Sequence, residues 1–203
     1  MVTKKFTELK EKSHFKYFDE IVFASEQLKY FTAHLFLLRP FIDSPLPAEV
    51  NGQILYYFYQ NPAGKRYNMY SDICFQKTYN YWDRIGDFLT MLLKEKKSRK
   101  IYFSNVLNDV NEEYKLNEHF NWLWDFNQKE YKSLNEKRIE IVQYFSLNTQ
   151  FREGHLQNVR NKDFIEKLQF EREALPQFFK TNTQLAALGF YHTLKLVELL
   201  DKN

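Results

Sequence analysis

Cysteine, glycine and proline are scarce in this sequence. Among its 203 residues there is one cysteine, and glycine and proline occur five times each. The single cysteine, Cys74, excludes an internal disulfide and any metal site built from several thiolates. Its neighbours are apolar and it falls within an expected helix, which indicates a buried structural thiol rather than a nucleophile. Because helix breakers are so few, the sequence favours long helices.

Long apolar runs are also missing. No stretch approaches the roughly 20 apolar residues that a membrane-spanning helix needs. The first 15 residues contain no apolar segment of signal-peptide length. We therefore expect a protein without a membrane span that is located in the cytoplasm.

A strong charge of either sign is absent as well. The net charge of +3 falls short of the basic balance of dedicated nucleic-acid binders, so a nucleic-acid site would have to be local. One dense basic run, KEKKSRK at residues 94–100, is typical of a solvated helix end whose cations suit the helix dipole. A phosphate-binding patch is the alternative interpretation of this run.

Aromatic residues, in contrast, are abundant, with 20 Phe, 14 Tyr and 3 Trp. Large rings can pack long helices together. The codon bias of an AT-rich genome would produce the same excess, so aromatic content alone does not indicate base stacking.

Apolar residues recur at helical spacing along most of the chain. The longest such segment is 15–38, with Ser13 as the expected N-cap and Pro40 as the expected stop. A second helix is predicted over 70–96, and Gly86 within it indicates close packing against a neighbouring helix. Further helices are predicted over 103–114, 118–131, 149–160 and 162–174, and a terminal helix after Pro176. Ser133 and Glu136 have capping-box spacing, which indicates a new helix or a continuation of the previous one.

One short segment has β character. Residues 53–60 (QILYYFYQ) are rich in β-formers and lead into the turn-like run Asn61–Gly64, so we expect a hairpin with residues 65–70. A buried helical segment is the alternative, and residues 43–52 are expected to form a loop. Taken together, the patterns predict a single domain over 1–203, an all-α bundle of five to seven helices with at most a short β-hairpin near 53–70.

Motifs for metals, phosphates and nucleophiles are missing from the sequence. The five histidines are scattered and none lies in a metal-binding motif, and no glycine-rich phosphate loop or nucleophile elbow occurs. We therefore expect neither a metal nor a cofactor. His192 lies on the apolar face of the terminal helix, where a histidine is more often a core residue with one satisfied nitrogen than a ligand or base.

Two stretches carry a resemblance. Residues 79–85 follow the pattern Tyr-x-x-Trp-Asp-Arg-Ile, and an Arg-Asn pair, Arg160 and Asn161, precedes the last helices. Together with the long first helix, these features resemble the HEPN (higher eukaryotes and prokaryotes nucleotide-binding) superfamily of all-α bundles. Many of its members are metal-independent endoribonucleases that act as dimers, so the resemblance implies a homodimer that processes RNA.

The resemblance also implies roles for particular residues. In the family motif an Arg, commonly followed by a polar residue, precedes a His by four to six residues. Arg160 and Asn161 match the first half, whereas no histidine lies four to six residues after Arg160 and His155 precedes the pair instead. In an active enzyme Arg160 would hold the phosphate, Asn161 would orient it and His155 would move the proton. The same stretch also fits a plain helix entry, with Asn161 as cap and Glu166 paired with Lys162.

Three functional hypotheses follow. The first is a HEPN-like protein linked to RNA or nucleotide transactions, either a metal-independent endoribonuclease or a catalytically degenerate relative. The second is a non-catalytic helical interaction module that binds a protein partner or itself. The third is a nucleotide-binding accessory whose protein partner is a nucleotidyltransferase. If the protein is instead a toxin, its protein partner would be an antitoxin.

Overall fold

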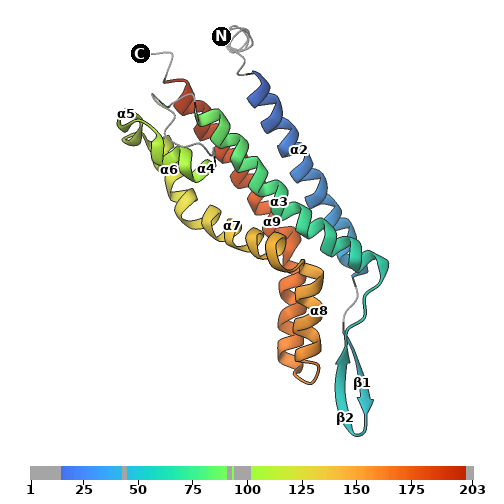
Figure 1. The fold of residues 1–203 in the computed structure, drawn as a ribbon. Helices are drawn as coiled ribbons and strands as arrows, with labels where there is room; N and C mark the ends of the chain where they lie inside the picture. Colours follow the sequence, from blue (N-terminus) through green and yellow to red (C-terminus); the bar gives the residue numbers. More distant parts are fainter. Residues whose placement is uncertain (1–14, 43–44, 91–92, 94–101, 200–203) are drawn as a thin grey trace. The chain divides into compact units, whose positions relative to one another are not determined.

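The computed structural model describes residues 15–42, 45–90, 93 and 102–199. The fold is a mostly α-helical bundle with one short antiparallel hairpin, which confirms the predicted fold class (Figure 1). Two compact units divide the chain. Unit 1 comprises residues 1–28, 77–135 and 183–203, and unit 2 comprises residues 29–76 and 136–182. Three helices, α2 (Phe15–Leu38), α3 (Pro62–Leu89) and α9 (Lys162–Val197), contribute residues to both units. The single-domain organisation stays a prediction.

Helices α2 (Phe15–Leu38) and α3 (Pro62–Leu89) have clear local causes. Helix α2 ends where Pro40 enters a 3₁₀ turn, Arg39–Phe41, as predicted, while Ser13 lies outside the described residues. Helix α3 begins earlier than expected. Asn61 accepts a hydrogen bond from the Gly64 N–H at 2.7 Å, and Pro62 occupies the first helical position. Asn followed by Pro favours a helix start. The Asn side chain caps the helix, and the N–H that Pro lacks would have no partner within the first turn.

The hairpin pairs β1 (Leu46–Val50) with β2 (Gln53–Tyr57). The strand predicted near 53–60 is therefore confirmed, but its partner is 46–50 rather than 65–70, which belong to α3. The connection is Asn51-Gly52, and both residues have positive φ, 54° and 75°. Two such residues form the turn that best matches strand twist, so this Asn-Gly pair, and not Asn61–Gly64, sets the register.

The middle of the chain is helical with changes of pitch. Helices α4 (Phe103–Asp109), α5 (Glu112–Lys115) and α6 (Glu118–Phe126) are followed by α7 (Lys132–Ile139), with π-helical turns at Asn127–Tyr131 and Glu140–Tyr144. Ser133 lies inside α7, so the capping-box spacing marks a continuing helix and not a new start. The basic run 94–100 lies outside the described residues.

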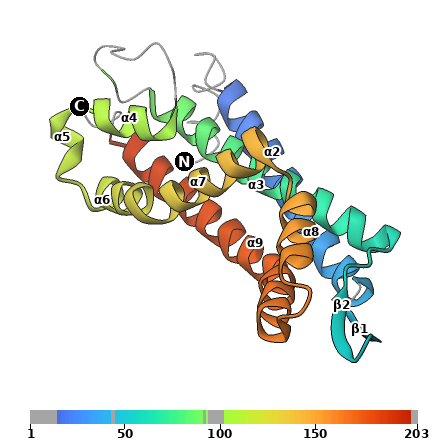
Figure 2. The same cartoon turned by 60° about the horizontal axis from the view of Figure 1, so that its bottom comes forward.

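The last third of the chain is simpler than predicted. Helix α8 (Leu147–Gln157) is followed by α9 (Lys162–Val197), a single helix of 36 residues that continues through Pro176. The expected break at Pro176 is therefore wrong, because one missing N–H does not end a helix whose neighbouring turns are packed along its length. Helix α8 and the first part of α9 lie side by side in both ribbon views (Figures 1 and 2).

An aromatic core fills unit 1. The fully buried Trp82 on α3 stacks on Phe126 of α6 with ring centroids 4.0 Å apart. Gly189 of α9 faces this ring, and a Cβ there would lie 2.3 Å from a Trp82 ring carbon. Gly86 likewise approaches the backbone of Phe103, since a Cβ at Gly86 would lie 2.9 Å from the Phe103 Cα. This short distance confirms the close packing predicted at Gly86.

Polar side chains are built into the core of unit 2. Arg172 of α9 is buried, and its Nε donates to Asn68 Oδ1 of α3 at 3.0 Å while its terminal nitrogen donates to the Gly64 carbonyl at 3.3 Å. Buried Cys74 confirms the structural thiol predicted from its neighbours, and burial raises the pKa of this thiol to about 12. Unit 2 is therefore held together by specific polar contacts as well as by apolar packing.

Candidate functional site

The three residues predicted to be catalytic lie close together in the sequence of unit 2, with His155 in α8 and with Arg160 and Asn161 in the turn between α8 and α9. His155 lies on the buried side of α8, and its Nε2 is 2.6 Å from the carbonyl oxygen of Tyr56 in β2. A carbonyl only accepts, so Nε2 carries the hydrogen. Burial lowers the pKa of His155 below its ordinary value, which favours the neutral ring. This histidine fastens the hairpin to α8.

Backbone pairing strengthens the same contact. The Tyr56 N–H donates to the Val159 carbonyl of the α8–α9 turn at 2.8 Å. Both backbone groups of Tyr56 are therefore bonded, the N–H to this turn and the carbonyl to His155 of α8. Phe58 adds an edge-on ring contact with His155, with centroids 5.5 Å apart. In the structure His155 therefore has a complete structural role.

Arg160 and Asn161 lie on the exposed side of this turn. Asn161 Oδ1 accepts the Phe164 N–H at 3.1 Å, which makes it the cap of α9. Lys162 pairs with Glu166 across one helical turn at 3.5 Å. These contacts confirm the helix entry expected from the sequence.

The structure does not bring His155 and Arg160 into one site within a single copy. Arg160 and Asn161 line an open surface hollow of about 650 Å³ formed by residues 157–163. His155 lines a different space, a cavity of about 20 Å³ that it shares with Arg172, Gln169 and apolar side chains. A cavity of this size holds about one water molecule, so it cannot accept a nucleotide.

A histidine pair in unit 1 was not predicted. Nδ1 of His119 on α6 and Nδ1 of His192 on α9 are 2.9 Å apart. The ring centroids are 5.1 Å apart, so each nitrogen points at the other ring, as in a hydrogen bond and not as in two ligands converging on a metal. One satisfied nitrogen on His192 is what its place on an apolar face predicted.

The surroundings of the pair indicate where a proton would be held. Glu118 Oε1 is 3.8 Å from His119 Nε2, whereas the His192 ring stacks on Trp122 at 4.6 Å. Desolvation and the neighbouring His119 both lower the pKa of His192. The lowered pKa favours a neutral His192 ring, which can accept the hydrogen bond between the two Nδ1 atoms.

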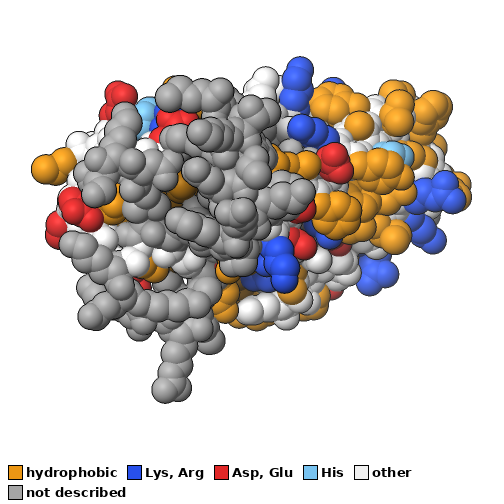
Figure 3. Space-filling view, turned by 90° about the horizontal axis from the view of Figure 1, so that it is seen from above, with side chains coloured by type: hydrophobic (Ala, Val, Ile, Leu, Met, Phe, Trp, Pro, Cys, Tyr) orange, Lys and Arg blue, Asp and Glu red, His pale blue; other side chains and the backbone are white. Residues whose placement is uncertain are grey.

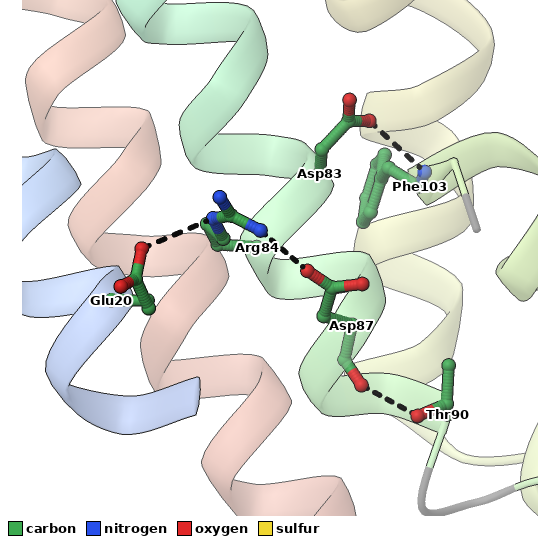
Figure 4. A network of polar contacts seen from close by, with 6 residues as sticks. All are labelled: Glu20, Asp83, Arg84, Asp87, Thr90 and Phe103. Carbon is green, nitrogen blue, oxygen red and sulfur yellow. Dashed lines mark hydrogen bonds and ion pairs between the residues drawn. The ribbon is translucent and has the colours of Figure 1, made fainter. Parts of the chain in front are cut away.

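The polar residues of the Tyr-x-x-Trp-Asp-Arg-Ile segment make local contacts in unit 1 (Figure 4). Arg84 is 46% exposed and pairs with Glu20 at 3.5 Å and Asp87 at 3.1 Å. Asp83 accepts long hydrogen bonds, both at 3.5 Å, from the Phe103 N–H and the Tyr131 hydroxyl. The charge of Arg84 lies at the surface, and these contacts connect α2, α3 and α4.

Another feature that the sequence patterns did not predict is an apolar surface in unit 2. The Tyr30 ring contacts the His34 ring of the same helix, with centroids 4.1 Å apart. The His34 ring also contacts the Tyr70 ring of α3, with centroids 5.5 Å apart. Leu37 and Phe41 are each 65% exposed. We call this surface the α2–α3 face, and its members are Tyr30, Ala33, His34, Leu37, Phe41, Met69 and Tyr70.

Figure 3 shows hydrophobic side chains gathered over the right-hand part of the visible surface, with Lys and Arg side chains at the margin. A signal for such a surface was present in the sequence. Between residues 28 and 41 apolar side chains occupy every side of the helix and not one stripe. A helix that is apolar all round is typical of a helix covered on all sides.

Metal and membrane features are absent from the part of the chain that the structure describes. Across residues 15–42, 45–90 and 102–199, no group of three or more His, Cys, Asp or Glu side chains could hold a metal ion. Within the same ranges, every helix is too short or too polar to cross a bilayer.

Comparison of the chain with protein-family models, with curated proteins and with solved structures found no match.

Proposed function

We propose that this protein is a non-catalytic helical interaction module that binds a protein partner or a second copy through the α2–α3 face. The observation that carries the proposal is the exposure of Leu37 and Phe41, both 65%, on a helix that is apolar all round. Contiguous exposed apolar side chains are unfavourable in water and mark interaction sites in stable proteins.

Hydrogen bonds and buried side chains hold the α2–α3 face in place. The Asn61 side chain donates to the Phe41 carbonyl at 2.8 Å, which joins the end of α2 to the start of α3. Beneath the face, Leu35 and Tyr67 are fully buried, and Tyr67 donates to the Arg172 carbonyl at 2.6 Å. A preformed surface loses little conformational entropy on binding.

The non-catalytic part of the proposal rests on the α8–α9 turn. His155 already donates its Nε2 hydrogen to a backbone carbonyl, and Asn161 already caps a helix. His155 lines a separate cavity, and Asn161, which lines the same hollow as Arg160, already uses its side-chain oxygen to accept the Phe164 N–H.

The test compares Leu37→Ser with a matched exposed leucine elsewhere, Leu188→Ser on α9. Tagged full-length wild type and both variants are used to capture partners from cells, and each is also weighed by light scattering after gel filtration. We expect a captured protein or a dimer with wild type and Leu188→Ser, and about a tenfold loss with Leu37→Ser, because a serine removes a central apolar contact.

Circular dichroism controls for folding of the two variants. The proposal is overturned if no captured protein and no oligomer distinguishes folded Leu37→Ser from the other two proteins.

A second candidate function is HEPN-like processing of RNA. It is favoured by the exposure of Arg160, Asn161 and Lys162 around one open hollow of about 650 Å³. An exposed guanidinium can hold a phosphate without a metal. Since His155 lines a separate cavity, the proton carrier would have to come from a second copy across a two-fold axis.

Purified protein and single-stranded RNA in EDTA test this candidate. Cutting that Arg160→Ala abolishes and Arg152→Ala preserves would support it, since Arg152 is another exposed arginine of the same unit. Unchanged cutting by Arg160→Ala would remove the assigned role, and no cutting by wild type would leave the interaction module as the function.

A further inference from the structure

We infer that the occupant of the α2–α3 face is an amphipathic helix with an acidic polar side, carried by another protein. This inference rests on the proposed function and adds the chemistry of the partner. Two properties of the face carry it, the spacing of its apolar side chains and the sign of the charges beside them.

The spacing fits a helix as occupant. Tyr30, Ala33, Leu37 and Phe41 follow one another at intervals of three and four residues along α2 and the turn after it. Side chains at such intervals form the ridges into which a second helix packs. Ala33 is a small exposed residue between the larger Tyr30 and Leu37, so a large side chain of the partner would pack against it.

An extended strand as partner fits less well, because the outer edge of β1 in the hairpin contains a proline. Tyr56 directs its backbone groups away from β1, toward Val159 and His155. Its cross-strand partner Pro47 therefore faces the opposite, outer edge, where proline has no N–H to donate. Strand addition at β1 would lose that hydrogen bond.

Most of the charges beside the face are positive, although exposed Glu26 lies one helical turn before Tyr30 on α2. From residue 27 to residue 41 the chain contains Lys29 and Arg39 and no acid, and from 62 to 71 it contains Lys65 and Arg66 and no acid. All four cations are exposed. Glu173 of α9 lies 3.9 Å from Arg39 and offsets part of that charge. Acidic side chains flanking an apolar stripe would complement this arrangement.

The same charges argue against a second copy of this chain. In a two-fold dimer the face would meet itself, so Lys29, Lys65 and Arg66 would oppose the same cations of the other copy. Like charges across an interface weaken association. The density of cations is also low for a membrane-surface helix, whose polar side is usually rich in Lys and Arg.

The experiment uses two synthetic peptides of about 18 residues with the same leucine stripe, one with Glu and one with Lys on the polar side. Fluorescence anisotropy measures the binding of each to the full-length protein. We expect the Glu peptide to bind about tenfold more tightly than the Lys peptide, with a preference that shrinks as salt is raised.

Three variants sharpen the measurement. Leu37→Ser should weaken binding of the Glu peptide about tenfold, whereas Leu188→Ser should not change it. The double variant Lys65→Glu and Arg66→Glu should reduce or reverse the preference for the Glu peptide, because it changes charge while leaving the apolar side chains in place.

The outcomes separate the two proposals. Equal binding of both peptides that is lost in Leu37→Ser overturns the acidic partner and supports the docking face. Binding of either peptide that Leu37→Ser leaves unchanged overturns both proposals. A dimer of the full chain, or binding to phosphatidylserine vesicles, that depends on Leu37 while neither peptide binds overturns the acidic helix in favour of a second copy or a lipid surface.

Discussion

The two compact units differ in how they treat their apolar side chains. Unit 1 buries its large rings around Trp82 and brings glycines against them, as at Gly189. Unit 2 fills part of its core with hydrogen-bonded polar groups, including Arg172 and Asn68, and leaves most of the exposed large apolar side chains of the described chain on its surface.

This contrast separates two uses of the same residue types. Close-packed rings give stability but leave no surface free for recognition. Exposed rings weaken solubility and are retained where they contact something else. Under the function proposed above, unit 1 is a packing scaffold and unit 2 carries the interaction surface, and three predictions test the contrast between the units.

The largest expected effect is in unit 1. Gly189→Ala would place a Cβ at 2.3 and 2.5 Å from two Trp82 ring carbons, so helix α9 or the indole must move. We expect the free energy of unfolding to fall by about 3 kcal/mol, measured by urea denaturation. The matched control is Gly154→Ala in unit 2, where the nearest atom would lie 3.5 Å away.

Gly154→Ala should raise the free energy of unfolding by about 0.5 kcal/mol, because alanine is the better helix former. Similar unfolding energies for the two variants would contradict the close packing assigned to unit 1.

The next effect concerns the polar core of unit 2. Burial raises the pKa of Asp72 to about 6, although its carboxylate accepts the Leu147 N–H at 3.1 Å. Because the folded pKa is above the ordinary aspartate value of 3.8, ionisation favours unfolding, and the stability from this group is lost as pH rises from about 4 to about 6.

Asp72→Asn keeps an acceptor oxygen for Leu147 and removes the charge. We expect it to stabilise the protein at pH 8 by about 1 kcal/mol, after allowance for the partial exposure of the carboxylate. The gain should disappear at pH 4, where wild-type Asp72 is protonated. Thermal denaturation at both values checks this, and an equal gain at pH 4 would rule out the charge as its cause.

The smallest effect is expected at the histidine pair of unit 1. The pKa of His192 is lowered, so the neutral ring stabilises the fold above pH 6.5, and this contribution is lost as pH falls toward the folded pKa. A second proton would also break the bond between the Nδ1 atoms, because one of them must accept.

His192→Gln should therefore make the difference in stability between pH 7.5 and pH 5.5 smaller by a few tenths of a kcal/mol. Ring-proton chemical shifts of the wild type followed by NMR give the pKa of each histidine directly. A measured pKa of His192 at or above the ordinary histidine value of 6.5 would contradict the predicted direction.

Local patterns in the sequence predicted much of the fold. The periodicity of residues 15–38 and the stop at Pro40 agree with α2, because apolar spacing and proline act within a few residues. Two errors also had local signals. Asn51-Gly52 marks the hairpin turn and Asn61-Pro62 starts α3, and both dipeptides could have been interpreted correctly from the sequence.

Other features had no local signal. Helix α9 continues through Pro176 because packing along 36 residues outweighs one lost hydrogen bond. His155 meets the Tyr56 carbonyl across 99 residues of sequence, and His119 meets His192 across 73. The roles of His155 and Arg160 were implied by the resemblance to a family motif, whereas the structure buries His155 and leaves Arg160 exposed.

The sequence by itself determined that this protein is helical, because helix formation depends on the spacing of apolar residues and on breakers and caps close by. Only the tertiary structure decided which apolar side chains are covered and which polar atoms are already bonded. That decision depends on which helix faces meet, and the side chains that meet are far apart in the chain. Leu35 and Leu37 are two residues apart, yet one is fully buried and the other is 65% exposed.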